Sequence, residues 1–192
     1  MTLDFAGSEK FVAAVDAAVE KDCDRALTDA LRNVLCKLIR DKDVTLPECV
    51  YQAHSDHYAR RELYTSARHG YNVVAMTWGP GQGTSIHDHD GLWCVEGVWD
   101  GELEIVQYDL RERNTEGCCQ FIPVATLQAG AGSAGSLIPP HEYHSIRNPS
   151  EDAVAVSLHI YKRAMTCCSV FTALGQDWYR PTVKSLALDN AA

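Results

Sequence analysis

The chain has 192 residues, of which 46% are hydrophobic and 22% are charged, as in a soluble globular domain with a substantial core. Its formal net charge of −9 at pH 7 argues against a nucleic-acid partner, because phosphate binding requires a basic surface. No apolar run approaches membrane-spanning length, and residues 1–4 lack the start of a signal peptide, so we expect a cytoplasmic protein without a membrane partner.

The first 46 residues have the periodicity of helices. Ser8 is a candidate cap for a first helix, in which apolar residues from Phe11 to Val19 share one face. A second helix is expected from about Asp24, with an apolar stripe that ends at Ile39. Residues 47–69 are expected to form a short helix or turn that leads into the first strand.

From Tyr71 onward the pattern changes to short strands separated by turn signals such as Asp100-Gly101. The expected strands are 71–78, 91–99, 102–110, 120–127, 135–138, 144–147 and 153–161. Short strands at this spacing predict a mainly β fold, a jelly-roll barrel behind N-terminal α-helices. We expect one domain over 1–192, with helices in 1–46, the barrel and its site in 70–163, and a C-terminal extension in 164–192.

Eight cysteines are many for a cytoplasmic chain, but they form no Cys-x-x-Cys pair and no zinc-finger spacing. Two pairs are adjacent in sequence, at 118–119 and 167–168, and are poorly placed to bridge to each other. In a reducing compartment we expect most of the cysteines to be free thiols that pack as small hydrophobic side chains.

Three histidines predict a metal site. His87 and His89 would point to the same face of a strand, since side chains alternate between faces. His144, 55 residues after His89, could reach them from a distant strand of a barrel. His141 is a rival for this third place. Asp88 must face the other way, either as a support for the site or at a solvated edge.

The surrounding residues form two motifs. In the first, five residues separate Gly81 from His87-x-His89, and Gly101 follows; in the second, four residues separate Pro139 from His144, and Asn148 follows after three more. Both motifs resemble those of the cupins.

Most cupins of this kind have a ligand Glu four or five residues after the second histidine, where this chain has Trp93 and Cys94. Three neutral imidazoles would leave open positions on a divalent metal, as in non-haem iron sites, and would favour an anionic ligand such as a thiolate.

The chain further resembles the cysteine dioxygenases, the thiol dioxygenase branch of the cupins, over roughly residues 58–161. The matching residues are Tyr58-x-Arg60, Trp78, His87-Asp88-His89, Cys94, His144 and the run Ser157-Leu158-His159-Ile160-Tyr161. The run Ser-x-His-x-Tyr is specific to this branch. The N-terminal helices and the residues after Tyr161 add nothing specific to the resemblance.

The resemblance implies an enzyme that converts L-cysteine and O2 to cysteine sulfinate, with no macromolecular substrate. Fe(II) would be held by His87, His89 and His144. Arg60, assisted by Tyr58, would bind the substrate carboxylate, and Tyr161 would hydrogen-bond substrate or oxygen. Ser157 and His159 would form a relay that tunes the Tyr161 phenol, and Cys94 would form a thioether cross-link with Tyr161.

Several alternatives remain open. Because Arg61 is next to Arg60, the sequence leaves open which of the two arginines would bind the substrate carboxylate. Tyr161 and His159 could be ordinary core residues. A 3-mercaptopropionate dioxygenase would share the metal site, but typically has Gln at the place of Arg60 and no Cys at the place of Cys94. A cupin isomerase and a non-catalytic cupin that binds a metal or small ligand are further rivals. A hydrolase built on Ser157 and His159 lacks a nucleophile elbow. The ligands alone do not decide between iron, nickel and zinc.

Overall fold

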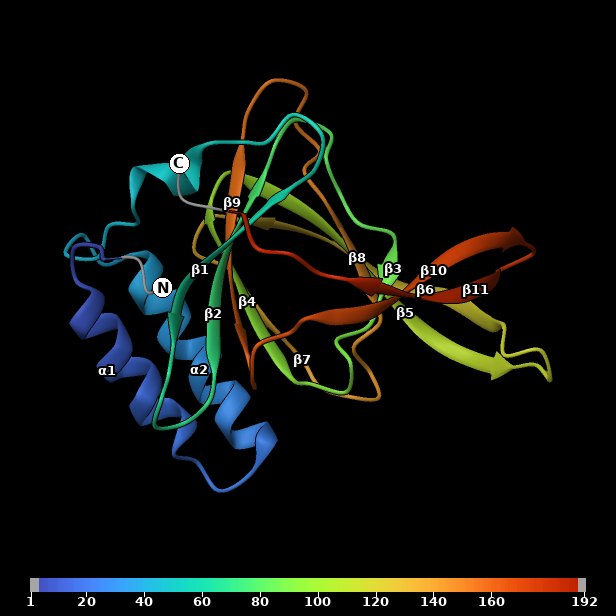
Figure 1. Cartoon of the computed structure of the whole chain (residues 1–192), viewed down its shortest axis with the longest axis horizontal. Coiled ribbons are helices and arrows are strands. Elements are labelled where there is room, and N and C mark those ends of the chain that lie inside the picture. The colour runs from blue at the N-terminus through green and yellow to red at the C-terminus, as the bar shows by residue number, and fades with distance from the viewer. Residues whose placement is uncertain (1–3, 190–192) are drawn as a thin grey trace.

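Two helices cover one side of the molecule in the computed structural model, which describes residues 4–189. They are α1 (Ser8–Val19) and α2 (Asp24–Ile39), which pack against each other and lie along the first sheet (Figure 1). The second helix begins where the sequence predicts. The cap of α1 is Gly7, with φ 77°, rather than Ser8, which is the first helical residue. Gly is needed because a Cβ at this position would collide with the Asp43 carbonyl oxygen.

The first sheet lies between the helices and the barrel interior. Its strand order is β1-β2-β9-β4-β7, and neighbouring strands are antiparallel. Its strands are β1 (Ala59–Thr65), β2 (Asn72–Trp78), β4 (Cys94–Asp100), β7 (Ala134–Leu137) and β9 (Ala155–Tyr161). Every residue of β2 and β9 is buried, because the helices cover one face and the barrel interior covers the other.

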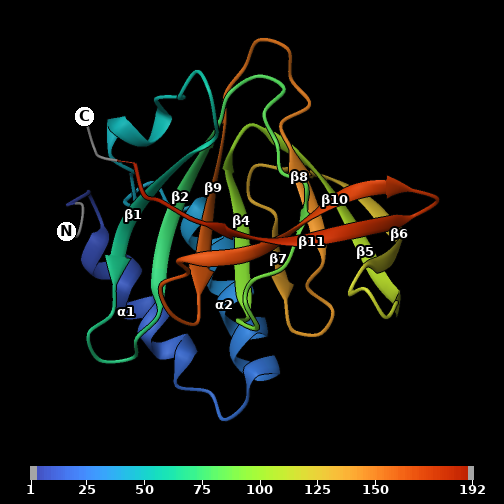
Figure 2. The same cartoon turned by 45° about the vertical axis from the view of Figure 1, so that its right-hand side comes forward.

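The second sheet faces the first and closes on itself in the order β10-β11-β6-β5-β8-β3. Its strands are β3 (Ile86–His87), β5 (Glu102–Arg113), β6 (Cys119–Gly130), β8 (His144–Arg147), β10 (Cys167–Gly175) and β11 (Trp178–Ser185). The ring closes because β10 pairs with both β11 and β3. Figure 2 shows the β10–β11 hairpin running across the front of the barrel.

The predicted strands are all present, with bounds shifted by a few residues, and three differences stand out. Residues 59–65 form strand β1, although the expected short helix does precede it as a 3-10 turn, Glu48–Tyr51. Residues 86–87 form the short strand β3, which the pattern did not single out. The strands are not confined to 70–163, since residues 167–185 contribute the hairpin that closes the ring.

Helix α2 packs closely against the first sheet where Leu35 contacts Gly97. Leu35 is fully buried, and a Cβ built on Gly97 of β4 would lie 2.8 Å from the Leu35 Cδ2 atom. A larger residue at position 97 would therefore push the helix away from the sheet.

Each of the eight cysteines has a free thiol. Within residues 4–189, neither helix has the length and apolar character needed to cross a membrane.

Candidate metal centre

Three histidine side chains converge inside the barrel. His87 on β3 is paired directly with His144 on β8, and His89 lies just beyond the end of β3. The ring centroids are 4.4 Å apart for His87 and His144, 5.0 Å for His89 and His144, and 5.4 Å for His87 and His89. One potential ligand atom from each ring lies within 4.8 Å of the others. The predicted face of three imidazoles is therefore formed.

The hydrogen bonds of these rings leave nitrogen atoms free for a metal ion. His87 Nδ1 lies 3.2 Å from the Ser85 carbonyl oxygen, and His144 Nδ1 lies 2.8 Å from that of Glu142. An Nδ1–H that donates to a carbonyl leaves Nε2 unprotonated, which is the form that binds a metal. His144 Nε2 and His89 Nδ1 are buried without a hydrogen-bond partner among the described residues. A divalent cation would satisfy these orphaned atoms, so the residues fit the expected metal.

Burial keeps the three rings neutral. It lowers the pKa of His87 to about 3 and that of His144 to about 4, and it holds the pKa of His89 well below its usual value. The His144 ring lowers the pKa of His87 and of His89 further. Neutral imidazole is the ligand form. His141, the rival of His144, is exposed and lies outside the cluster.

Asp88 faces away from the metal centre and fixes the loop that bears His89. Its Oδ1 accepts hydrogen bonds from the backbone N–H of Ser169, at 2.8 Å, and of Asp90, at 3.2 Å. The first bond joins this loop to β10. Asp88 thus supports the position of His89 from the opposite side of the chain.

The predicted Ser157 and His159 pair is present on β9. Ser157 Oγ lies 2.8 Å from His159 Nε2 and accepts a hydrogen bond of 2.8 Å from the Trp78 indole N–H. The His159 and Tyr161 rings are nearly parallel, at 18°, with centroids 6.0 Å apart. Within the described residues no hydrogen bond joins these two rings. The predicted relay therefore extends from Ser157 to His159 and does not reach the phenol.

Cys94 and Tyr161 lie side by side next to the metal centre. They are partners in the β4–β9 register, and the Tyr161 hydroxyl is within hydrogen-bonding reach of the Cys94 thiol. The Tyr161 ring lies 5.8 Å from the His89 ring. Burial raises the pKa of both groups well above their usual values, and the proximity of Cys94 raises the pKa of Tyr161 further. The phenol and the thiol are therefore protonated at neutral pH.

Glu96 is a site residue that the sequence reasoning missed. It is 6% exposed, and its Oε2 lies 3.4 Å from His159 Nδ1 and 3.7 Å from His144 Nε2. Burial raises its pKa to about 7. The position expected for a ligand carboxylate is four or five residues after His89, whereas Glu96 is seven residues after it. Strand alternation, which puts Cys94 and Glu96 on the same face, would have found it.

Arg60 and Arg61 point to opposite sides of β1, and of the two only Arg60 lines the small cavity beside the histidines. The Arg60 guanidinium donates to the carbonyl oxygens of Ala187, at 3.1 Å, and Met165, at 3.5 Å, while its Nε has no partner among the described residues. Arg61 donates instead to Thr77 Oγ1, at 3.0 Å, and to the carbonyl oxygen of Gln52, at 2.8 Å. Arg60 is thus the arginine that faces the site.

A small cavity joins Arg60 to the metal centre. It has a volume of about 20 Å³, and its walls include Tyr58, Arg60, Trp78, His87, His159 and Tyr161. Tyr58 is stacked on Trp78 with ring centroids 4.6 Å apart. Of the nine residues predicted for the site, these walls therefore contain five, and His89, His144, Ser157 and Cys94 adjoin them.

A double-layered β barrel with two N-terminal helices and three converging histidines defines a metal-binding cupin. Residues 34–173 match Cysteine dioxygenase type I, and because this match spans most of the chain, the chain belongs to that family. A site of three histidines is typical of the family.

Curated relatives agree with this assignment at low identity. The chain is 25% identical over 162 residues to Cysteine dioxygenase type 1 of Rattus norvegicus, a match that covers 77% of this chain and 79% of the relative. It is 27% identical over 111 residues to the Danio rerio protein of the same name, which covers 58% of this chain and about half (54%) of that relative.

Solved structures give more distant similarities. A protein of Klebsiella pneumoniae with a double-stranded beta-helix domain aligns with TM-score 0.46 and 16% identity, covering 64% of this chain and 85% of that chain. TT1209 of Thermus thermophilus aligns with TM-score 0.42 and 20% identity, covering 58% and 89%.

Proposed function

We propose that this protein is an iron-dependent dioxygenase that converts L-cysteine and O2 to cysteine sulfinate. The observation that carries the proposal is the set of groups around one small cavity, with buried neutral imidazoles on one side and an arginine and a phenol on the other. Membership of the family and the names of the relatives support it.

Fe(II) would be held by His87, His89 and His144. When bound, it would bring the thiolate and dioxygen into reaction, so that both oxygen atoms are transferred to sulfur. Three neutral ligands leave the charge of the cation uncompensated, which favours binding of the substrate as a thiolate.

Arg60 would select the substrate by its carboxylate. Two carbonyl oxygens hold the guanidinium in place, and its unpartnered Nε remains a donor on the cavity wall. A fixed cation with planar donors suits a carboxylate better than a flexible ammonium would. Tyr58, stacked on Trp78 in the same wall, would complete the contact surface.

Tyr161 would donate a hydrogen bond to the bound substrate. Its raised pKa keeps the proton on the phenol, so that it acts as a donor. Ser157 would hold His159 with Nε2 as acceptor and Nδ1–H directed at Glu96. We assign Ser157 and His159 a positioning role behind Tyr161, and Cys94 a role in fixing the phenol.

Oxygen uptake by iron-loaded protein tests the proposal. We expect uptake with L-cysteine and formation of cysteine sulfinate, with one O2 consumed per thiol. Parallel assays use 3-mercaptopropionate, no thiol, and protein loaded with zinc. A strong preference for 3-mercaptopropionate would assign the other thiol dioxygenase activity. Uptake with neither thiol would contradict the proposal.

A further inference from the structure

A second and larger cavity lies inside the barrel, next to the cavity at Arg60. Its volume is about 230 Å³, compared with about 20 Å³ for the cavity at Arg60. Ile146 and His159 line both cavities. The two spaces are therefore neighbours that share a wall formed by these two side chains.

The larger cavity opens to solvent between β6 and β7. Leu127 on β6 is 47% exposed, and Gly135 on β7 is also exposed, although both residues line the cavity. A Cβ built on Gly135 would meet no heavy atom within 4 Å beyond its chain neighbours. Strand β7 is the last strand of its sheet and is paired with β4, whereas β6 belongs to the other sheet. A small molecule can therefore enter without separating paired strands.

The walls of the larger cavity are mainly apolar. The apolar side chains that line it include Leu103, Ile105, Leu127, Ala129 and Ile146. No lysine, arginine or aspartate is among the described residues that line it. Such walls favour a ligand that is itself uncharged and apolar.

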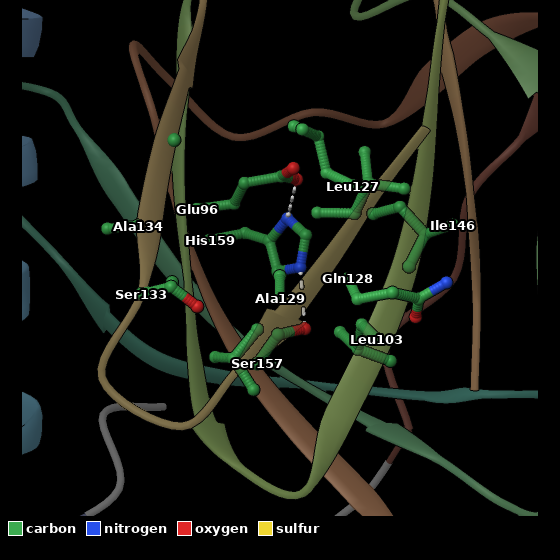
Figure 3. Close-up of a pocket in the computed structure, with 14 residues that line it drawn as sticks. Glu96, Leu103, Leu127, Gln128, Ala129, Ser133, Ala134, Ile146, Ser157 and His159 are labelled. Atoms are coloured by element: carbon green, nitrogen blue, oxygen red, sulfur yellow. Dashed lines mark hydrogen bonds and ion pairs between the residues drawn. The ribbon is translucent and has the colours of Figure 1, made fainter. Parts of the chain in front are cut away.

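The polar side chains on the wall lie against one another. Ser157 Oγ lies 2.8 Å from His159 Nε2, and His159 Nδ1 lies 3.4 Å from Glu96 Oε2. Figure 3 shows these three side chains joined by two dashed lines, with Leu103 and Ile146 nearby. An apolar molecule can therefore occupy the cavity without separating any of these contacts.

The two reactants of a thiol dioxygenase differ in how well they suit this cavity. L-Cysteine carries charges, and moving an unpaired charge from water into apolar surroundings is strongly unfavourable. Dioxygen is small, uncharged and apolar, so it has no such cost. An apolar cavity of about 150 Å³ is large enough to bind xenon, which is also a small apolar gas. The larger cavity therefore suits dioxygen and excludes the amino acid.

The cavity at Arg60 has too little room to admit both reactants. A cavity needs roughly 10–15 Å³ to hold a single water molecule, so about 20 Å³ is filled once a thiol lies between Arg60 and the histidines. Dioxygen then has to arrive from another side. Ile146 stands between the two cavities, and rotamer changes of the kind that occur in packed cores would open this wall.

We propose that the larger cavity takes up dioxygen from solvent and delivers it past Ile146 to the metal centre. The proposal rests on the proposed dioxygenase function, because only an enzyme that consumes O2 needs such a route. It separates the entry of the two reactants: the charged thiol enters on the side of Arg60, and the apolar gas enters between β6 and β7.

Methyl NMR spectra of the full-length protein under xenon pressure test the binding site. The protein is loaded with Zn(II), which has no redox chemistry, so the result does not depend on activity. We expect saturable shifts for the methyl groups of Leu103, Ile105 and Ile146, and none for Val183, which is 79% exposed. Ala129→Phe should fill the cavity and abolish these shifts. Absence of xenon shifts at the lining residues of the unsubstituted protein would overturn the proposal.

Steady-state kinetics of the Fe(II)-loaded protein test the route. Ala129→Phe should lower kcat/KM for O2 by about tenfold or more, because it slows association, and should leave KM for L-cysteine unchanged. The matched control is Ala173→Phe, the same change at an exposed position of β10, which should alter neither value. Ala129→Leu replaces the first variant if that variant does not fold.

The two measurements distinguish failure of the route from failure of the proposed function. Loss of xenon binding in the Ala129 variant with an unchanged kcat/KM for O2 would overturn the route alone. Absence of O2 uptake by the unsubstituted protein with either thiol would contradict the proposed function, and the route with it, whatever the xenon spectra show.

Discussion

Cys94 and Tyr161 are direct cross-strand partners on β4 and β9, with the thiol in hydrogen-bonding reach of the phenol. Both side chains are buried, at 0% and 1% exposure. The pair lies next to the His89 ring, so a sulfur atom and an aromatic ring are held together beside the proposed iron. This is the arrangement that a thioether between the Cys94 sulfur and the ring carbon next to the hydroxyl would require.

We predict that this thioether forms during turnover. Iron-loaded protein incubated with L-cysteine and O2 should lose the mass of two hydrogen atoms, and a linked Cys94–Tyr161 peptide should survive reduction. Cys94→Ser protein should show no loss and should keep reduced activity, because the cross-link restricts the phenol without providing it. Unlinked peptides from fully active protein after many turnovers would leave Cys94 with a packing role alone.

Removal of any one of His87, His89 or His144 should lower metal content and abolish activity. Each ring supplies one of three clustered ligand atoms, and two imidazoles hold a divalent cation much less tightly than three. Metal analysis after gel filtration of the Ala variants measures the effect. His141→Ala is the control, since this exposed neighbour should keep full occupancy. Full iron content in His144→Ala protein would contradict the assignment.

Arg60→Gln should reduce the preference for L-cysteine over a thiol without a carboxylate. Loss of one partner of a buried carboxylate–guanidinium pair costs about 2–4 kcal/mol, or roughly 30- to 1000-fold in relative kcat/KM. Steady-state assays with L-cysteine and cysteamine give the ratio. Arg163→Gln, which changes an arginine with 61% exposure, is the control and should leave the ratio unchanged. A ratio unaffected by Arg60→Gln would place the carboxylate partner elsewhere.

Leu35→Ala should destabilise the fold by about 2–5 kcal/mol, because it empties the contact between α2 and Gly97 of β4. Denaturant unfolding of the metal-free protein measures the change. Asn33→Ala, on the exposed face of the same helix, should change the free energy of unfolding by less than about 0.5 kcal/mol. Comparable losses in both variants would contradict the packing role of Leu35, because Ala is the best helix former and the substitution itself does not weaken the helix.

The sequence predicted those features that depend on local spacing. Alternation and motif spacing placed His87, His89 and His144 together, and the helix beginning at Asp24 followed from its apolar stripe. The same alternation placed Ser157, His159 and Tyr161 on one strand. It did not predict how far the relay extends, because the contact between His159 and Tyr161 depends on ring orientation.

Features that depend on pairing between segments far apart in the chain could not be predicted from the sequence. Strand β1 is short and polar in part, and it becomes a strand by pairing with β2. Residues 167–185 have no motif of their own, yet they close the ring through β3 and β6. Alternation along β4 places Glu96 on the face of Cys94, but its burial and its neighbours His144 and His159, which come from two other strands, depend on distant pairing.

The contacts of Arg60 tie the first strand of the barrel to the C-terminal end of the described chain. Its guanidinium donates to the carbonyl oxygens of residues 165 and 187, and its backbone N–H donates to Asp189 Oδ2 at 2.8 Å. The position of Arg60 is therefore set by the last described residues of the chain, and trimming the chain before residue 187 would remove two of these contacts while leaving every strand of the barrel in place.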